Sequence, residues 1–163
     1  MLKDYQKRIL ELLEQLELEL AGLYELFSGK YPGRKDLWDT LVQEEREHAD
    51  QAKKLHLLAD EGKASFDEKM TKTYTVQLFI DNVKKVYAET EANKISLLKA
   101  LTLSNDFEQS IIEKKLYDYF ISGDPDVKAI IKHIQEDTND HLSRIKKAIK
   151  EEKTGDGSSL KEV

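Results

Sequence analysis

The chain has 163 residues, of which 36% are charged and 39% are hydrophobic, so it is expected to fold as one domain and is too apolar to be disordered. It contains no cysteine, which excludes disulfides, zinc–thiolate sites and cysteine-ligated iron–sulfur clusters. The formal net charge of −6 argues against a nucleic-acid-binding surface. Because the N-terminal stretch "MLKDYQKRILELLEQLELEL" has no long uncharged run, we expect no signal peptide, no membrane span and a cytoplasmic location.

Apolar residues recur at helical spacing in five segments that are separated by short breaks. Ser96 and Asp124 are suited to cap the fourth and fifth of these segments, and Pro125 suits a first helical turn. No segment shows the sustained alternation that is typical of a strand. The spacing therefore predicts an all-α chain with helices over 2–28, 36–61, 74–91, 96–121 and 125–150.

The breaks between helices predict how the helices pair. A short connection joins the first two long helices and another joins the last two, so each pair should be antiparallel. The segment 60–95 must then connect the two pairs, and it is long enough to run the length of a bundle. We predict an antiparallel four-helix bundle over residues 1–150, with a long crossover that includes a short fifth helix. Residues 151–163 have little to bury and are predicted to form a flexible tail.

Each of the four long helices has a carboxylate or an imidazole on its apolar face. Any one of them alone would be explained as a Glu that reaches solvent or as a hydrogen-bonded core His. Together they would bury several charges, which is unfavourable unless a cation balances them. Oxygen and imidazole ligands from four facing helices suit iron or manganese, and zinc is also compatible. The residues are Glu17, Glu45, His48, Glu108 and His141.

Two similar stretches, "QEEREH" (43–48) and "QEDTNDH" (135–141), end in these histidines. The first contains a Glu-x-x-His pair. The second has Thr138 where that Glu would stand, and Asp137 one residue earlier. Because Asp137 is four residues before His141, it shares a helical face with that imidazole and is a candidate metal ligand.

Lys115 gives a second reason to question the later half of the site. It is seven residues after Glu108, on the same face of the predicted helix, so it could neutralise that carboxylate without any metal. Three interpretations remain open: a two-metal site, a site with one metal, and a site that no longer binds metal.

The motifs resemble those of rubrerythrin-like proteins in the ferritin-like di-iron carboxylate superfamily. In that family each half of the bundle supplies a Glu from one helix and a Glu-x-x-His from the next. Here Glu17 and the Glu-x-x-His of residues 45–48 match the first half, and Tyr24 falls at the family's tyrosine position. Glu108 and His141 fall where the second half has ligands, and the internal duplication is also a family feature.

The resemblance covers about residues 5–150 and implies a non-haem di-iron oxidoreductase. It would reduce peroxide or oxidise ferrous iron and protect the cell from oxidative stress. Since the chain has no cysteine-ligated iron module, reduction would need a separate electron-donor protein. Homodimerisation, as in family members, is also expected. The implied ligands are Glu45 and Glu108 as bridges, His48 and His141 as terminal ligands, and Glu17 and Asp137 to complete the set. The alternative is a degenerate helical module without redox catalysis that binds metal or a protein partner.

Overall fold

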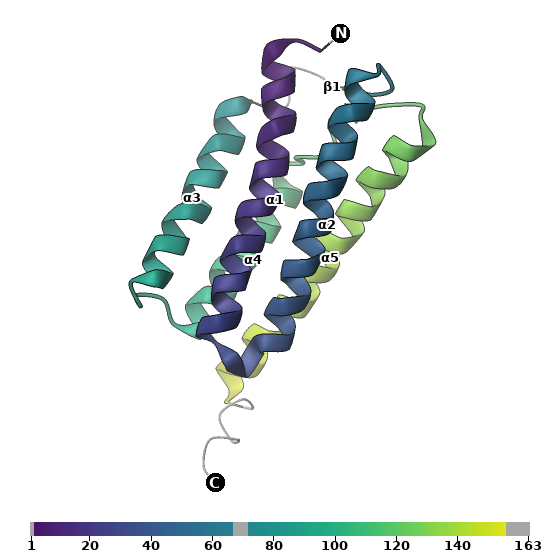
Figure 1. The fold of residues 1–163 in the computed structure, drawn as a ribbon. Helices are drawn as coiled ribbons and strands as arrows, with labels where there is room; N and C mark the ends of the chain where they lie inside the picture. Colours follow the sequence, from purple (N-terminus) through teal and green to yellow (C-terminus); the bar gives the residue numbers. More distant parts are fainter. Residues whose placement is uncertain (1, 67–71, 156–163) are drawn as a thin grey trace.

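The fold is shown by a computed structural model that describes residues 2–66 and 72–155 (Figure 1). Within this part of the chain there are five α-helices, so the all-α prediction is confirmed. A 3-10 turn, Pro32–Arg34, and two short strands, β1 and β2, complete the secondary structure. The elements are α1 (Asp4–Lys30), α2 (Lys35–Asp60), β1 (Ser65–Phe66), α3 (Thr73–Glu91), α4 (Leu97–Glu113), β2 (Phe120–Ile121) and α5 (Pro125–Thr154).

The predicted helix pairs are both present. α1 packs against α2, α4 packs against α5, and contacts between α2 and α5 join the two pairs. α3 lies along α1. It takes the chain from the end of the molecule where α2 finishes to the opposite end, where α4 begins (Figure 1). Because α3 takes the chain across this length, α4 can begin beside the turn between α1 and α2.

The helix ends follow the local sequence. The side chain of Ser96 accepts a hydrogen bond from the backbone N of Lys99, 3.2 Å away, at the start of α4. Asp124 Oδ1 likewise accepts from the backbone N of Asp126 at 2.8 Å and starts α5, with Pro125 in its first turn. Both predicted caps are therefore confirmed.

α4 is shorter than the sequence predicts, which is the main error in the predicted elements. It ends at Glu113, not near residue 121. Lys115 then adopts a positive φ of 50°, and the chain turns so that Leu116 and Tyr117 become buried. Beyond this turn, β2 pairs antiparallel with β1, a small sheet that the helical spacing did not predict.

α5 is longer than predicted, and ion pairs stabilise its C-terminal end. Arg34, in the turn after α1, donates to Glu151 at 2.6 Å and to Glu152 at 2.8 Å. These contacts keep residues that we expected in a flexible tail within the helix, which ends at Thr154. The rest of the predicted tail, 156–163, lies outside the described residues.

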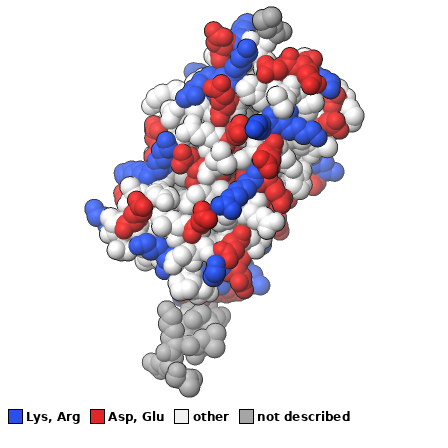
Figure 2. Space-filling view, in the orientation of Figure 1, with Lys and Arg blue, Asp and Glu red and all other residues white. Residues whose placement is uncertain are grey.

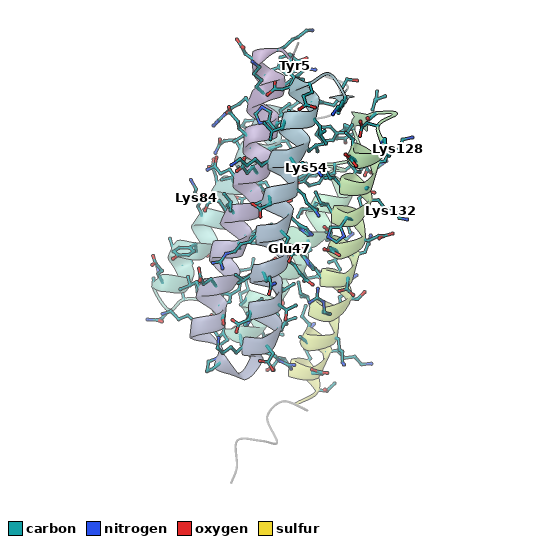
Figure 3. The ribbon with its side chains drawn as sticks, turned by 45° about the vertical axis from the view of Figure 1, so that its right-hand side comes forward. Tyr5, Glu47, Lys54, Lys84, Lys128 and Lys132 are labelled. Carbon is teal, nitrogen blue, oxygen red and sulfur yellow. The ribbon has the colours of Figure 1, made fainter. Side chains whose placement is uncertain are left out.

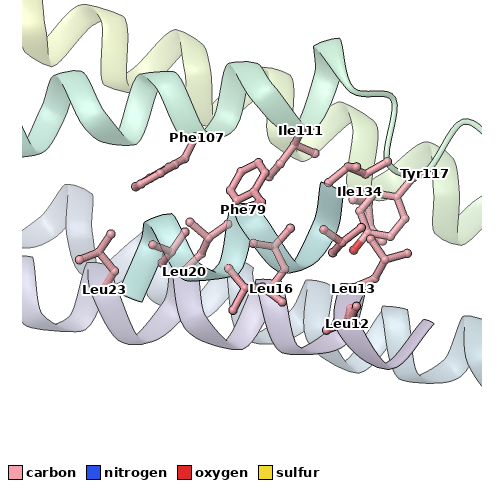
Figure 4. Packing of buried hydrophobic residues seen from close by; sticks show 14 of the residues in the cluster. Leu12, Leu13, Leu16, Leu20, Leu23, Phe79, Phe107, Ile111, Tyr117 and Ile134 are labelled. Atoms are coloured by element: carbon pink, nitrogen blue, oxygen red, sulfur yellow. The ribbon is translucent and has the colours of Figure 1, made fainter. Parts of the chain in front are cut away.

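Leucines and aromatic rings fill the space between the helices (Figure 4). Leu16 and Leu20 of α1 are fully buried, and Phe79 of α3 packs on Phe107 of α4 with 5.7 Å between ring centroids. Each fully buried Leu of this kind contributes about 1.5–3 kcal/mol relative to an exposed one. The apolar faces of α1, α3 and α4 therefore form one continuous core.

Charged side chains occupy the outer surface. Figure 2 shows acidic and basic groups interspersed over one face of the molecule. Lys54 on α2 and Lys132 on α5 project from the outer faces of their helices (Figure 3). Among the described residues, no helix combines the length and apolar character that crossing a membrane requires.

Candidate metal centre

Five predicted ligands from four helices meet in the interior. None of them is more than 1% exposed. They form two groups in which the potential ligand atoms all lie within 4.8 Å of one another. The first group is Glu17, Glu45 and His48, and the second is Glu45, Glu108 and His141. These helices thus place two clusters of oxygen and nitrogen donors side by side, with one shared member.

Glu45 is the shared member because its two oxygens face in different directions. Its Oε2 lies 3.1 Å from Nδ1 of His48, and its Oε1 lies 3.0 Å from Nδ1 of His141. The two imidazole rings stack with 5.4 Å between their centroids. Glu108 belongs to one group only, its Oε2 being 3.4 Å from Nδ1 of His141. Glu45 is therefore placed to contact both donor groups, whereas Glu108 belongs to the second group alone.

Several donor atoms of the cluster are buried without a hydrogen bond. They are Oε2 of Glu17, Oε1 of Glu45, Oε2 of Glu108 and both ring nitrogens of His141. Although Glu45 and His141 approach to 3.0 Å, their orientation is not that of a hydrogen bond. Each unpaired buried polar group costs roughly 1–3 kcal/mol. A divalent cation between these atoms would remove that cost, so the donor set fits a metal ion.

Two tyrosines orient the carboxylates of Glu108 and Glu17. Tyr24 of α1 donates its hydroxyl proton to Oε1 of Glu108 at 2.6 Å. Tyr117, in the turn after α4, donates in the same way to Oε1 of Glu17. In both cases the other carboxylate oxygen, Oε2, is left without a hydrogen bond. Each half of the molecule thus positions the carboxylate of the other half.

The sequence identified Tyr24 but missed Tyr117, and it placed Lys115 on the face of Glu108. That placement is corrected by the structure. Because α4 ends before residue 115, Lys115 does not continue the face of Glu108, and its side chain is exposed. The signal that could have identified Tyr117 is weak: a tyrosine nine residues after Glu108, just before a break.

Asp137 also lies elsewhere than predicted. Its Oδ2 is 3.2 Å from Nε2 of His48, the ring nitrogen that points away from Glu45. On the other imidazole, Oε2 of Glu44 lies 3.0 Å from Nε2 of His141. Carboxylates in this position fix the tautomer and orientation of a metal-binding imidazole. Asp137 therefore contacts a candidate ligand from outside the two donor groups. Glu44 takes the matching position beside His141, although Nε2 of His141 makes no hydrogen bond.

Asp137 and Glu44 have different neighbours on the side that faces away from the donor groups. His133 Nε2 lies 3.2 Å from Oδ2 of Asp137, whereas Arg144 forms an ion pair with Glu44.

Thr138 is buried, and its hydroxyl donates to the carbonyl O of Ile134 at 2.7 Å. It therefore adds no carboxylate to the cluster.

The protonation of the cluster shows how its charges balance without a cation. Burial raises the pKa of Glu17 well above its ordinary value and that of Glu108 to about 6, with the charge of Glu45 adding to both shifts. Burial would also raise the pKa of Glu45, but its interactions with the two imidazoles lower it instead. Burial opposes protonation of His48 and His141, yet the neighbouring carboxylates raise their pKa values to about 9 and about 11. In the metal-free cluster the raised pKa values favour imidazolium ions beside the carboxylates, and a metal ion would have to replace their protons.

Replacing Asp137 with Asn is expected to weaken metal binding about 10- to 100-fold without changing the number of ions bound, because the substitution removes the carboxylate that orients His48. Asp140→Asn is the matched control: Asp140 is more exposed and pairs with Arg144. Its affinity should remain that of the original chain. Competition for the metal by a chromophoric chelator measures both. Equal effects of the two substitutions would contradict the assigned role of Asp137.

The centre offers three carboxylates and two imidazoles, a donor set compatible with iron, manganese or zinc. Its ligands come from α1, α2, α4 and α5, and its supporting residues come from the same helices and the turn after α4. Comparison of the chain with models of protein families, with curated proteins and with solved structures gives no match.

Proposed function

We propose that the protein is a rubrerythrin-like member of the ferritin-like di-iron carboxylate superfamily, and that α1, α2, α4 and α5 form its antiparallel four-helix bundle. The observation that supports this most strongly is the position of Glu45 in both donor groups. A carboxylate whose two oxygens face two imidazoles is suited to bridge two metal ions. The order of donors along the chain also supports it, because a Glu precedes a His-bearing helix in each half.

The proposed activity is reduction of peroxide or oxidation of ferrous iron. Bound iron would supply the redox chemistry toward peroxide or oxygen. The chain's own residues would position the ligands. Tyr24 and Tyr117 hold the carboxylates of Glu108 and Glu17, Asp137 orients His48, and Glu44 lies beside the outer nitrogen of His141. The surrounding core limits the access of water.

Two partners are proposed for the oxidoreductase: an electron-donor protein and a second copy of the chain. Without cysteine it has no iron–thiolate centre of its own, so a separate protein would supply electrons for peroxide reduction. A homodimer in the cytoplasm stays our prediction. Two apolar side chains one turn apart on α3, Tyr74 and Leu78, are 74% and 42% exposed and support a contact there.

Anaerobic titration with ferrous iron, followed by peroxide, tests the proposal. We expect uptake of two ferrous ions per chain and then consumption of peroxide as the iron is oxidised. The double substitution Glu45→Ala, His48→Ala should abolish both. Glu47→Ala, on the exposed face of the same helix (Figure 3), is the matched control and should change neither. Iron uptake no greater than that of the double variant would contradict the proposal.

A second function is supported by Thr138, which stands where the Glu of the second Glu-x-x-His pair would be. In this alternative the cluster is a neutralised core of imidazolium and carboxylate groups in a non-catalytic helical module that binds metal or a protein partner. The same titration separates the two functions. The module predicts either no iron uptake or uptake without consumption of peroxide.

A further inference from the structure

The candidate metal centre is nearly two-fold symmetric, apart from one position. Each residue of one half has a counterpart of the same chemistry in the other. Glu45 is the exception, because its counterpart by position is Thr138. The matched pairs are Glu17 with Glu108, His48 with His141, Tyr117 with Tyr24, and Asp137 with Glu44.

Thr138 does not replace the missing carboxylate by other means. It lies three residues before His141, on the same face of α5, and is only 2% exposed. Its hydroxyl is turned back to the carbonyl of Ile134 in its own helix. A short side chain in this conformation leaves the second bridging position without a protein ligand.

A cavity of about 240 Å³ lies against this position. Its wall includes Thr138 and Tyr117, the same residue whose hydroxyl holds Glu17. The apolar part of the remaining wall comes from Ile111, Ile112, Leu116 and Ile134, and the polar part from Asp118, Gln135 and Asn139. The cavity is smaller than the 300–1,000 Å³ that is usual for drug-sized ligands. It therefore suits a molecule of a few carbon atoms with an apolar body.

Charge indicates what the polar end of such a molecule would be. With Glu17, Glu45 and Glu108 ionised and both imidazoles neutral, the five candidate ligands would supply three negative charges to two divalent cations. The carboxylates outside this set, Glu44 and Asp137, contact Arg144 and His133. One further monoanion would neutralise the centre, and a buried net charge is unfavourable. The position beside Thr138 is the one at which symmetry calls for a carboxylate.

We infer that the metal-loaded centre would bind a short-chain monocarboxylic acid, with its carboxylate beside Thr138, in the place of the missing Glu, and its alkyl end in the cavity. This inference depends on the proposed two-metal site. It adds to that site the class of small molecule that would bind there.

Cobalt(II), whose visible absorption reports its coordination, provides a test in two stages. Metal uptake is measured first, by titration to two ions per chain. Acetate is then added at constant ionic strength, with chloride as the control salt. We expect a saturable spectral change at one acetate per chain and none with chloride. In a series from formate to hexanoate, affinity should rise with chain length and fall once the alkyl end exceeds the cavity.

Two substitutions at Thr138 show where acetate binds. Thr138→Glu would supply the missing carboxylate, so this variant should retain its cobalt and lose the response to acetate. Thr138→Val keeps the size of the side chain and should retain both. Failure to bind cobalt would overturn the proposed function and the inference together. Cobalt uptake without an acetate response, or a response that Thr138→Glu leaves unchanged, would overturn the inference alone.

Discussion

Replacing Glu45 with Ala is expected to reduce the metal content from two ions per chain to none, the largest effect of any single substitution in the centre. Its two oxygens face His48 and His141, so its loss removes a ligand from both ions at once. Glu17 and Glu108 each belong to one donor group, and their replacement by Ala should leave one ion bound. Elemental analysis of the protein after loading and gel filtration measures this difference.

The control for this prediction must separate loss of a ligand from loss of the fold. Glu45→Ala leaves two buried imidazolium ions without their common counter-ion, which is itself destabilising. Glu45→Gln keeps the shape of the side chain, and circular dichroism shows whether each variant remains helical. A folded Glu45→Gln protein that still binds two ions would contradict the bridging role.

The sequence predicted which candidate ligands are buried because a regular helix places them. Within α1 and α2, spacing of three, four and seven residues is enough to put Glu17, Glu45 and His48 on buried faces. The same rule holds for His141 within α5. Wherever the helix continues, position along the chain determines the face, and the prediction follows from the sequence.

Residue spacing no longer predicts which side chains share a face beyond the end of a helix. α4 stops at Glu113, so the seven-residue step from Glu108 to Lys115 leaves the helix, and the turn brings Tyr117 to Glu17 instead. No short-range pattern predicts that turn, because it depends on the positive φ of Lys115 and on the pairing of β1 with β2.

Asp137 illustrates a different limit. Spacing showed that it shares a broad face with His141, but it did not show which neighbouring helix that side chain would reach. In the structure it reaches α2 and contacts the outer nitrogen of His48. The alignment of the two similar stretches on their histidines, which places Thr138 opposite Glu45, also places Asp137 opposite Glu44. That alignment is the signal that could have identified both of these carboxylates.

Metal is expected to stabilise the protein much more at pH 8 than at pH 6, and the metal-free protein should show the opposite trend. The folded-state pKa values of His48 and His141 are raised to about 9 and about 11. Their stabilising contribution is complete below the ordinary histidine pKa of about 6.5 and is lost as pH rises through the folded-state values. Glu108, whose pKa is raised to about 6, contributes a further loss of stability between about pH 4.5 and 6.

Metal binding reverses this dependence because both imidazoles must give up their protons to become ligands. At pH 7 we expect the release of about two protons per chain from the histidines, so that apparent affinity rises about 100-fold per pH unit. Calorimetric titration in two buffers with different ionisation enthalpies counts the protons, and thermal unfolding at pH 6, 7 and 8 follows stability. His56→Asn, on α2 but paired with Asp60 outside the centre, should leave the count unchanged. Binding of two ions without proton release would show that the imidazoles are neutral before the metal arrives, and would contradict the charge balance between Glu45 and the two histidines.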